Sequence, residues 1–256
     1  TRCDKWRISR SFRFIWHHVW KAGTTSLSPY LSCNFDALPV ASLLRQLGGP
    51  VPGYLHVGTA REPLSRFVSG YQEVYFRDLA GSGSRCNHRQ VPWLRVALDY
   101  AEGGTQSHAP RAAGDASRPK CPIGALGAEG ALRVLEQFVS DVSCGVRFGN
   151  GEHLMSQVLF LGANTSSPLP LDLLLRLESL EAGVDELKRR IGYHAQDICP
   201  LGKERSQGEK PVSVPSQSDV RRSLGPPLLQ TVCDILMIDF VCLGYPLPPG
   251  CELLRR

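Results

Sequence analysis

Two segments of the chain share one pattern, in which a short apolar run is followed by a polar turn and then by a stretch that favours a helix. The first is FIWHHVWKAGTTSL at residues 14–27, for which we expect a strand over 13–19. The second is GYLHVGTA at 53–60, a strand candidate followed by a helix with Pro63 in its first turn. Because parallel strands need a crossover connection, usually a helix, two such units predict a parallel α/β sheet.

Weaker patterns divide the rest of the chain. We expect helices in pieces over 24–35 and 38–49, broken near Pro29 and Pro39, and further helices over 127–142, 179–192 and 217–245, the last interrupted or started at Pro226-Pro227. Strand-like runs lie within 156–162 and 171–180. Since there is no internal repeat and no linker between two cores, we expect one α/β domain over 1–256, with a central, mostly parallel sheet flanked by helices.

Residues 80–128 differ in composition from the rest. They are rich in Gly, Ser, Pro and Ala and contain few large apolar residues, which predicts a long loop or insertion. Six Lys or Arg stand against three Asp or Glu, so the segment carries a local charge of +3. An acidic partner and a solvated loop without a partner are equally compatible with that charge.

Charge and hydropathy disfavour other classes of protein. The net charge of +5 is spread along the chain, which favours anionic ligands but not a nucleic-acid partner. No stretch approaches about 20 uninterrupted apolar residues, so we expect no membrane span in this chain. A start at Thr1 is compatible with a mature or luminal portion whose targeting segment precedes it.

The nine cysteines are scattered, with no CxxC pair and no Cys/His knuckle spacing. This spacing disfavours zinc, and we expect no metal. Scattered cysteines favour a disulfide-bearing protein of an oxidising compartment, in which the odd number leaves at least one thiol without a partner in this chain. The alternative is a set of buried free cysteines that act as small apolar residues.

The turn after the first strand combines features that suit a terminal phosphate. A helix that starts after a parallel strand presents several unpaired backbone N–H groups at one point, and glycine lets the backbone approach a ligand closely. Hydroxyl groups stand at the helix start, and a lysine supplies a point charge. The candidate phosphate-binding residues are Lys21, Ala22, Gly23, Thr24, Thr25 and Ser26.

The second strand–helix junction offers a second phosphate site. In AREPLSRFVSGY, Arg61 ends the strand and can fork onto a phosphate, and Ser69 can donate from the helix that follows. Two such sites on consecutive units predict a nucleotide with phosphates at two separate positions. A P-loop NTPase has GxxxxGK[ST], with lysine after the glycine, whereas Lys21 precedes Gly23 here, so this class is disfavoured by residue order.

Both junctions resemble the nucleotide motifs of Golgi-type carbohydrate sulfotransferases. HVWKAGTTSL resembles the family's 5′-phosphosulfate loop, HxPKxGGTS, and TAREPLSRFVSGY is similar to its 3′-phosphate element, R[DE]PxxRxxSxY. Three later pieces agree in order: GEHLMSQVLFLG with an HxxxQ segment, LRLESLEAGVDEL with xExLxxxxxxL, and CDILMIDFVCLGY with the terminal DFxxxGY. The 3′-phosphate element matches at Arg61, Glu62, Pro63, Arg66, Ser69 and Tyr71.

The resemblance implies a sulfotransferase, P-loop NTPase-like architecture and an enzyme that uses 3′-phosphoadenosine 5′-phosphosulfate as donor, without a metal. The acceptor would be a hydroxyl or amine of a glycan or glycoconjugate. Lys21 would be catalytic and would bind the 5′-phosphate together with the residues up to Ser26, and Arg61 and Ser69 would hold the 3′-phosphate. The family also implies the Golgi lumen, with a full-length type II membrane protein.

An acceptor hydroxyl needs a base, and the sequence leaves this residue open. His18 aligns with the family histidine before the loop, and His56 lies on the strand that leads to Arg61. His17 and His18 point to opposite faces of a strand, so at most one faces the cleft. His153 and Glu62 are further candidates, whereas Arg66, Gln157 and Glu178 favour structural roles.

Two other functions compete with a sulfotransferase. Trp20 stands where the family usually has proline, and the loop has one glycine rather than two, which is compatible with a non-catalytic module that binds a nucleotide or an anionic glycan. A kinase that acts on nucleotide phosphates is a weaker alternative, because the order of lysine and glycine disfavours it.

Overall fold

The computed structural model describes residues 6–39, 51–74, 127–144, 153–161, 171–202 and 215–252. The chain divides into two compact units. The first contains Thr1–Arg66, Met155–Ser206 and Ile238–Pro246, and the second contains Phe67–Leu154, Gln207–Met237 and Leu247–Arg256. The expected single domain stays a prediction, and the expected insertion at 80–128 lies outside the described residues except for its last two positions.

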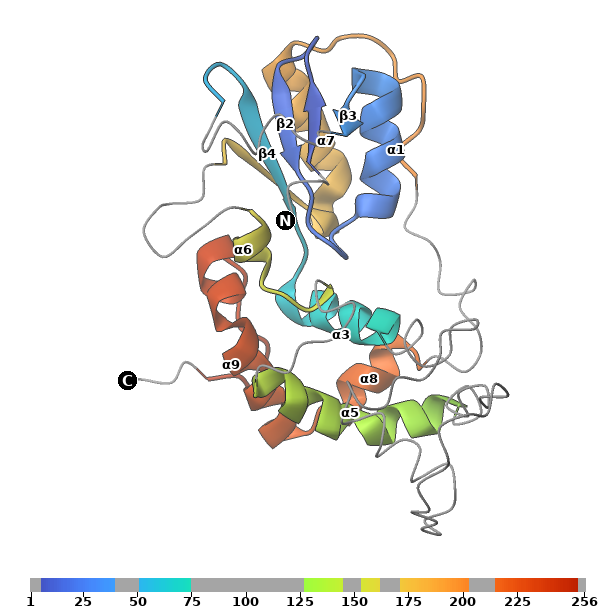
Figure 1. The fold of residues 1–256 in the computed structure, drawn as a ribbon, viewed down its shortest axis with the longest axis vertical. Helices are drawn as coiled ribbons and strands as arrows, with labels where there is room; N and C mark the ends of the chain where they lie inside the picture. The colour runs from blue at the N-terminus through green and yellow to red at the C-terminus, as the bar shows by residue number, and fades with distance from the viewer. Residues whose placement is uncertain are drawn as a thin grey trace, which may run out of the picture. The chain divides into compact units, whose positions relative to one another are not determined.

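The first unit contains a five-stranded sheet in the order β3-β1-β2-β4-β5 (Figure 1). The α/β class is confirmed, but the sheet is mixed rather than mostly parallel: β2–β4 and β4–β5 are parallel, whereas β1 is antiparallel to both β2 and β3. A short turn returns the chain from β1 to β2, which only an antiparallel pair permits. The strands are β1 Arg7–Ser9, β2 Phe14–His17, β3 Leu38–Pro39, β4 Leu55–Ala60 and β5 Leu173–Arg176.

Helices α1 (Thr24–Phe35) and α7 (Leu180–Ile191) supply the apolar residues for one face of the parallel strands. Leu27, Tyr30, Leu31 and Phe35 of α1 and Val184 and Leu187 of α7 form one buried cluster with Phe14, Trp16, Val57 and Leu175 of the sheet. This packing positions the start of α1 directly after β2. The expected end of α7 is confirmed, because Gly192 adopts a left-handed φ of 68° that glycine accepts without strain.

Two local expectations are wrong. Helix α1 continues through Pro29, whose ring lies within the second turn, because the helix buries one whole side against the sheet and this packing outweighs the lost hydrogen bond. The expected strand within 156–162 is instead the short helix α6 (Gln157–Phe160). The Asp239 carboxylate accepts hydrogen bonds from the backbone N–H groups of Gln157 and Val158, which satisfies the start of that helix.

The second unit contains helices and receives the later part of α3 (Pro63–Val74). Phe67 and Tyr71 of α3 pack their rings against Phe138 of α5 (Gly127–Ser143). The closing segment forms two helices, α8 (Gln217–Ser223) and α9 (Pro226–Leu243), so the expected interruption before the proline pair is confirmed. A capping box between Ser216 and Asp219 starts α8.

Helix α9 is long and apolar enough to cross a membrane by length and composition alone, and a third of it is buried within the protein. A core helix of a protein that does not span a membrane can have the same length and composition. Asp239 near the end of α9 is fully buried and caps α6, so this part of the helix is integrated into the first unit.

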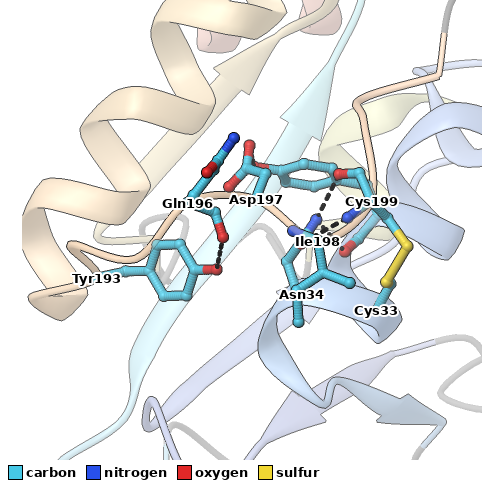
Figure 2. The surroundings of a disulfide bond; sticks show 8 residues. Cys33, Asn34, Tyr193, Gln196, Asp197, Ile198 and Cys199 are labelled. Carbon is cyan, nitrogen blue, oxygen red and sulfur yellow. Dashed lines mark hydrogen bonds between the residues drawn. A yellow bond between two sulfur atoms is a disulfide. The ribbon is translucent and has the colours of Figure 1, made fainter.

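Two disulfides join cysteines within the described residues, Cys33–Cys199 and Cys233–Cys251, which confirms the expectation of a disulfide-bearing chain. Figure 2 shows the first of them, where Asn34 also holds the backbone beside Cys199. The Asn34 side chain donates to the Cys199 carbonyl at 2.9 Å and accepts from the Ile198 N–H at 2.7 Å. Cys144 and Cys242 are free and exposed. The cysteines at 3, 86 and 121 lie outside the described residues.

We predict that the two disulfides contribute unequally to stability. Cys33–Cys199 closes a sequence separation of 166 residues and Cys233–Cys251 one of 18. Chain-entropy arithmetic gives about 5 and about 3 kcal/mol for loops of these lengths. We therefore expect Cys33→Ser with Cys199→Ser to lower the free energy of unfolding in urea more than Cys233→Ser with Cys251→Ser. Cys144→Ser should have little effect, and equal losses for the two pairs would contradict the prediction.

Candidate functional site

The carboxyl ends of β2, β4 and β5 meet at one edge of the sheet, because these three strands are parallel and adjacent. The turn 18–23 follows β2, residues 61–62 follow β4, and the short helix η5 (Leu177–Ser179) follows β5. In open α/β sheets, ligands bind in the crevice outside this edge. The edge therefore contains both sequence-predicted phosphate junctions.

A hydrogen-bonded turn joins the end of β2 to α1. The Thr24 hydroxyl donates to the Val19 carbonyl at 3.1 Å and also contacts His18 Nε2. Since a hydroxyl has one proton, His18 Nε2 must carry the hydrogen and donate to Thr24. The Thr24 hydroxyl thus holds the turn closed, and a base role for His18 would have to run through Nδ1.

The backbone of this turn is left-handed at two positions. Gly23 has a φ of 82° and Lys21 a φ of 64°, which is uncommon for a residue with a side chain. A Cβ on Gly23 would also lie 2.9 Å from the Leu177 side chain, so both conformation and packing explain the glycine. Left-handed backbone at a residue with a side chain, as at Lys21, gathers at functional sites.

The first turn of α1 has the features expected of an anion site. Helix geometry leaves the N–H groups of Thr24 and Thr25 without an intrahelical acceptor, while Ser26 N–H donates to the Gly23 carbonyl at 3.1 Å. Thr25 is exposed, whereas Ala22 and Ser26 are buried. Exposed amides at a helix start attract negative charge.

Two arginines that follow β4 reach the carbonyl groups of this turn. Arg66 Nε donates to the Trp20 carbonyl at 2.8 Å, and Arg61 Nη1 lies 3.5 Å from the Lys21 carbonyl oxygen. Arg66 is buried, and burial lowers the pKa of its guanidinium to about 10, which leaves it charged at neutral pH. The structure therefore brings Lys21 and Arg61 together, and Arg66 binds the same turn.

The backbone N–H and carbonyl groups of Arg61 form hydrogen bonds with a side chain and not with another strand. The Gln157 side chain accepts from the Arg61 N–H at 2.9 Å and donates to the Arg61 carbonyl at 2.8 Å. The next N–H, of Glu62, donates to the Glu178 carboxylate at 2.6 Å. We call residues 61–62 the arginine corner. The sequence motifs containing Gln157 and Glu178 signalled structural roles, but not that both side chains bind this corner.

Glu62 directly precedes α3, and Ser69 lies within it. The Glu62 carboxylate caps the helix by accepting from the N–H groups of Leu64 and Ser65, at 3.0 and 2.7 Å. A carboxylate engaged in this way is poorly placed to act as the acceptor's base. Ser69 and His153 are buried and belong to the second unit, whereas Arg61 belongs to the first.

The histidine pair, His17 and His56, is buried between β2 and β4. The Val51 N–H donates to His56 Nε2 at 3.2 Å, so His56 carries its hydrogen on Nδ1 and donates it to His17 Nε2 at 2.9 Å. Burial lowers the pKa of both rings, and that of His17 falls to about 3 with the neighbouring His56. His56 is the second residue of β4, near the end opposite the arginine corner, so this geometry disfavours it as a base.

No family model, no curated protein and no solved structure matches this chain. The assignment of the site therefore rests on its own geometry and on the two motifs. Within the described residues, no group of three or more His, Cys, Asp or Glu side chains is placed to hold a metal ion.

We predict that Lys21→Gly is more stable than Lys21→Ala by about 1 kcal/mol, because both remove the amine but only glycine accepts a left-handed backbone without strain. Thermal unfolding of the two variants measures the difference. The same pair at Asp185, an exposed position within α7, is the matched control, where alanine should be the more stable by about 1 kcal/mol. Equal stability of the two Lys21 variants would show that the backbone at this position is unstrained.

The histidine pair predicts a loss of stability in acid. The folded-state pKa of His17 is about 3 and its ordinary value is 6.5, so between these values the unfolded chain binds a proton that the folded chain does not. Stability from this group is present above pH 6.5 and falls with pH, by about 2 kcal/mol between pH 7 and pH 5. Urea unfolding at pH 7 and pH 5 measures this loss. In His17→Gln, the free energy of unfolding should differ less between the two pH values than in the wild type. His194→Gln, at an exposed histidine, should retain the wild-type difference; a wild-type slope in His17→Gln would refute the prediction.

Proposed function

We propose that this protein is a sulfotransferase that moves a sulfuryl group from 3′-phosphoadenosine 5′-phosphosulfate to a hydroxyl or amine of a carbohydrate. One observation carries the proposal: the two phosphate-type junctions lie at the same sheet edge, with the Arg61 guanidinium beside the Lys21 carbonyl. A nucleotide with phosphates at the 3′ and the 5′ position of its ribose needs cationic groups from two such junctions. The motif resemblance to carbohydrate sulfotransferases supports the same assignment, including their P-loop NTPase-like architecture.

Each phosphate position of the donor has its own binding group in this proposal. Lys21 and the N–H groups at the start of α1 bind the 5′-phosphate, together with residues 22–26. Arg61 binds the 3′-phosphate, and the motif resemblance implies the same role for Ser69. A guanidinium suits this second role because it donates two parallel hydrogen bonds to phosphate oxygens. The chemistry of these groups therefore fits a doubly phosphorylated adenosine.

The chemistry asked of the protein is mainly electrostatic. When bound, the donor supplies the sulfuryl group and leaves negative charge on its 5′-phosphate oxygen. In this proposal, Lys21 and the first-turn amides of α1 stabilise that charge as it develops. Positioning and charge stabilisation also account for most of the catalysis in the related phosphoryl transfers.

A non-catalytic module that binds the nucleotide or an anionic glycan is the second candidate, and the histidines favour it. His18 donates from Nε2 to Thr24, and His17 and His56 donate and accept within their own pair. Glu62 caps a helix. Several residues with the right chemistry for a general base are thus engaged elsewhere.

The setting we propose is the lumen of the Golgi, with this chain as part of a longer type II membrane protein and a glycoconjugate as its partner. The two disulfides support an oxidising compartment. The Golgi assignment itself comes from the motif resemblance.

Calorimetric titration with 3′-phosphoadenosine 5′-phosphate tests the donor site. We expect saturable binding by the wild-type protein and a loss of about 10- to 100-fold in Lys21→Ala and in Arg61→Ala, the range for hydrogen bonds to charged groups. Arg189→Ala, at an exposed arginine of α7, removes the same charge as Arg61→Ala and should bind like the wild type.

Turnover of labelled donor across a panel of glycans then separates the two functions. Robust product formation rules out the non-catalytic module, whereas saturable nucleotide binding without product supports it. Unchanged activity in both Lys21→Ala and Arg61→Ala would refute the assignment of the site.

A further inference from the structure

The arginine corner depends on a carboxylate that comes from the neighbouring strand. β4 and β5 run in register, with Ala60 opposite Arg176. Two residues beyond each of these positions stand Glu62 and Glu178, and the Glu178 Oε1 atom accepts the Glu62 N–H at 2.6 Å. The sheet thus has one more connection between β4 and β5 after its ladder has ended, made by a side chain instead of a carbonyl.

Glu178 is itself held from its other side. Its Oε2 atom accepts the Tyr245 hydroxyl at 3.0 Å, and the Tyr245 ring lies over the Arg176 guanidinium, 4.3 Å from the ring centroid. Arg176 in turn donates to the Leu243 carbonyl at 2.6 Å, at the end of α9. Burial, together with the Glu178 carboxylate, raises the pKa of Tyr245 and keeps its hydroxyl protonated as a donor.

Three consecutive backbone groups of the corner are therefore bound by side chains from outside β4. Gln157 holds the N–H and carbonyl of Arg61, and Glu178 holds the N–H of Glu62. These bonds determine the direction in which the Arg61 side chain leaves the backbone. An arginine that binds a phosphate through two parallel hydrogen bonds tolerates little rotation of its backbone.

We propose that Glu178 is a positioning residue that fixes the arginine corner so that Arg61 meets the 3′-phosphate of the donor. This inference rests on the proposed function. Glu178 acts through hydrogen-bond geometry and neither touches the donor nor takes a proton from the acceptor. Its effect on binding must then require both Arg61 and the 3′-phosphate.

The test compares 3′-phosphoadenosine 5′-phosphate with adenosine 5′-phosphate, which lacks the 3′-phosphate, by calorimetric titration. In Glu178→Ala we expect the affinity for the first nucleotide to fall about tenfold while that for the second stays unchanged. In the Arg61→Ala background, Glu178→Ala should cause no further loss. Glu181→Ala, at an exposed glutamate three residues away on α7, is the matched control and should bind like the wild type.

Glu178→Gln distinguishes geometry from charge. The glutamine oxygen can accept the Glu62 N–H, and its amide can donate to the Tyr245 oxygen, so both contacts survive without the negative charge. We therefore expect Glu178→Gln to retain most of the wild-type affinity. Tyr245→Phe keeps the ring over Arg176 and the bond from Glu178 to the Glu62 N–H but removes the hydroxyl, so it should weaken 3′-phosphate binding less than Glu178→Ala does, about threefold. If Glu178→Ala does not fold, Tyr245→Phe replaces it as the test variant.

The outcomes separate this inference from the proposed function. If the wild-type protein does not bind 3′-phosphoadenosine 5′-phosphate, the proposed function fails and the inference fails with it. If the wild type binds but Glu178→Ala weakens both nucleotides equally, or loses further affinity in the Arg61→Ala background, only the positioning role is overturned. A loss in Glu178→Gln as large as in Glu178→Ala would also overturn it, because charge rather than geometry would then matter.

Discussion

The parallel pairing of β2 with β4 is the constraint on which the rest of the site depends. It sets His17 opposite Gly58 and so brings the turn after β2 to the same edge as the arginine corner after β4. An antiparallel pairing of the same two strands would send the two junctions to opposite ends of the sheet. The helices that follow each junction supply the apolar residues that bury the strands, so the same packing energy that forms the core also places the charged groups.

The junctions are held by side chains that satisfy backbone groups where the ladder stops. Gln157 and Glu178 form hydrogen bonds with the backbone of the arginine corner. Arg66 donates to the Trp20 carbonyl, and Thr24 donates to the Val19 carbonyl. Buried backbone groups left without such partners would each cost about 1 to 3 kcal/mol. The polar residues around this edge are thus first of all structural, and this explains why several base candidates are already engaged.

Much of the fold around the site could be predicted from local pattern. Both strand–turn–helix units, the end of α7 at Gly192 and the helix start at the Pro226-Pro227 pair follow from apolar period, glycine and proline, which act over a few residues. Two expectations failed because distant contacts outweighed local preference. Helix α1 continues through Pro29 because it is packed along its length, and residues 157–160 form a helix because Asp239, 82 residues away, caps their N–H groups. The mixed sheet was also missed, since no local pattern reports that β1 pairs antiparallel with β2.

The sequence by itself determined which chemical groups are present and where along the chain they follow a strand: a lysine and hydroxyls after the first, arginines after the second. Only the tertiary structure decided which of these groups lie close together and which form hydrogen bonds within the protein. It put Arg61 beside the Lys21 carbonyl, joined His17 to His56, and turned Glu178 toward a backbone N–H 116 residues away in the chain. The reason is physical: residue type sets what a side chain can bind, whereas the partner it binds depends on which strands lie next to each other, and strand pairing is a long-range property.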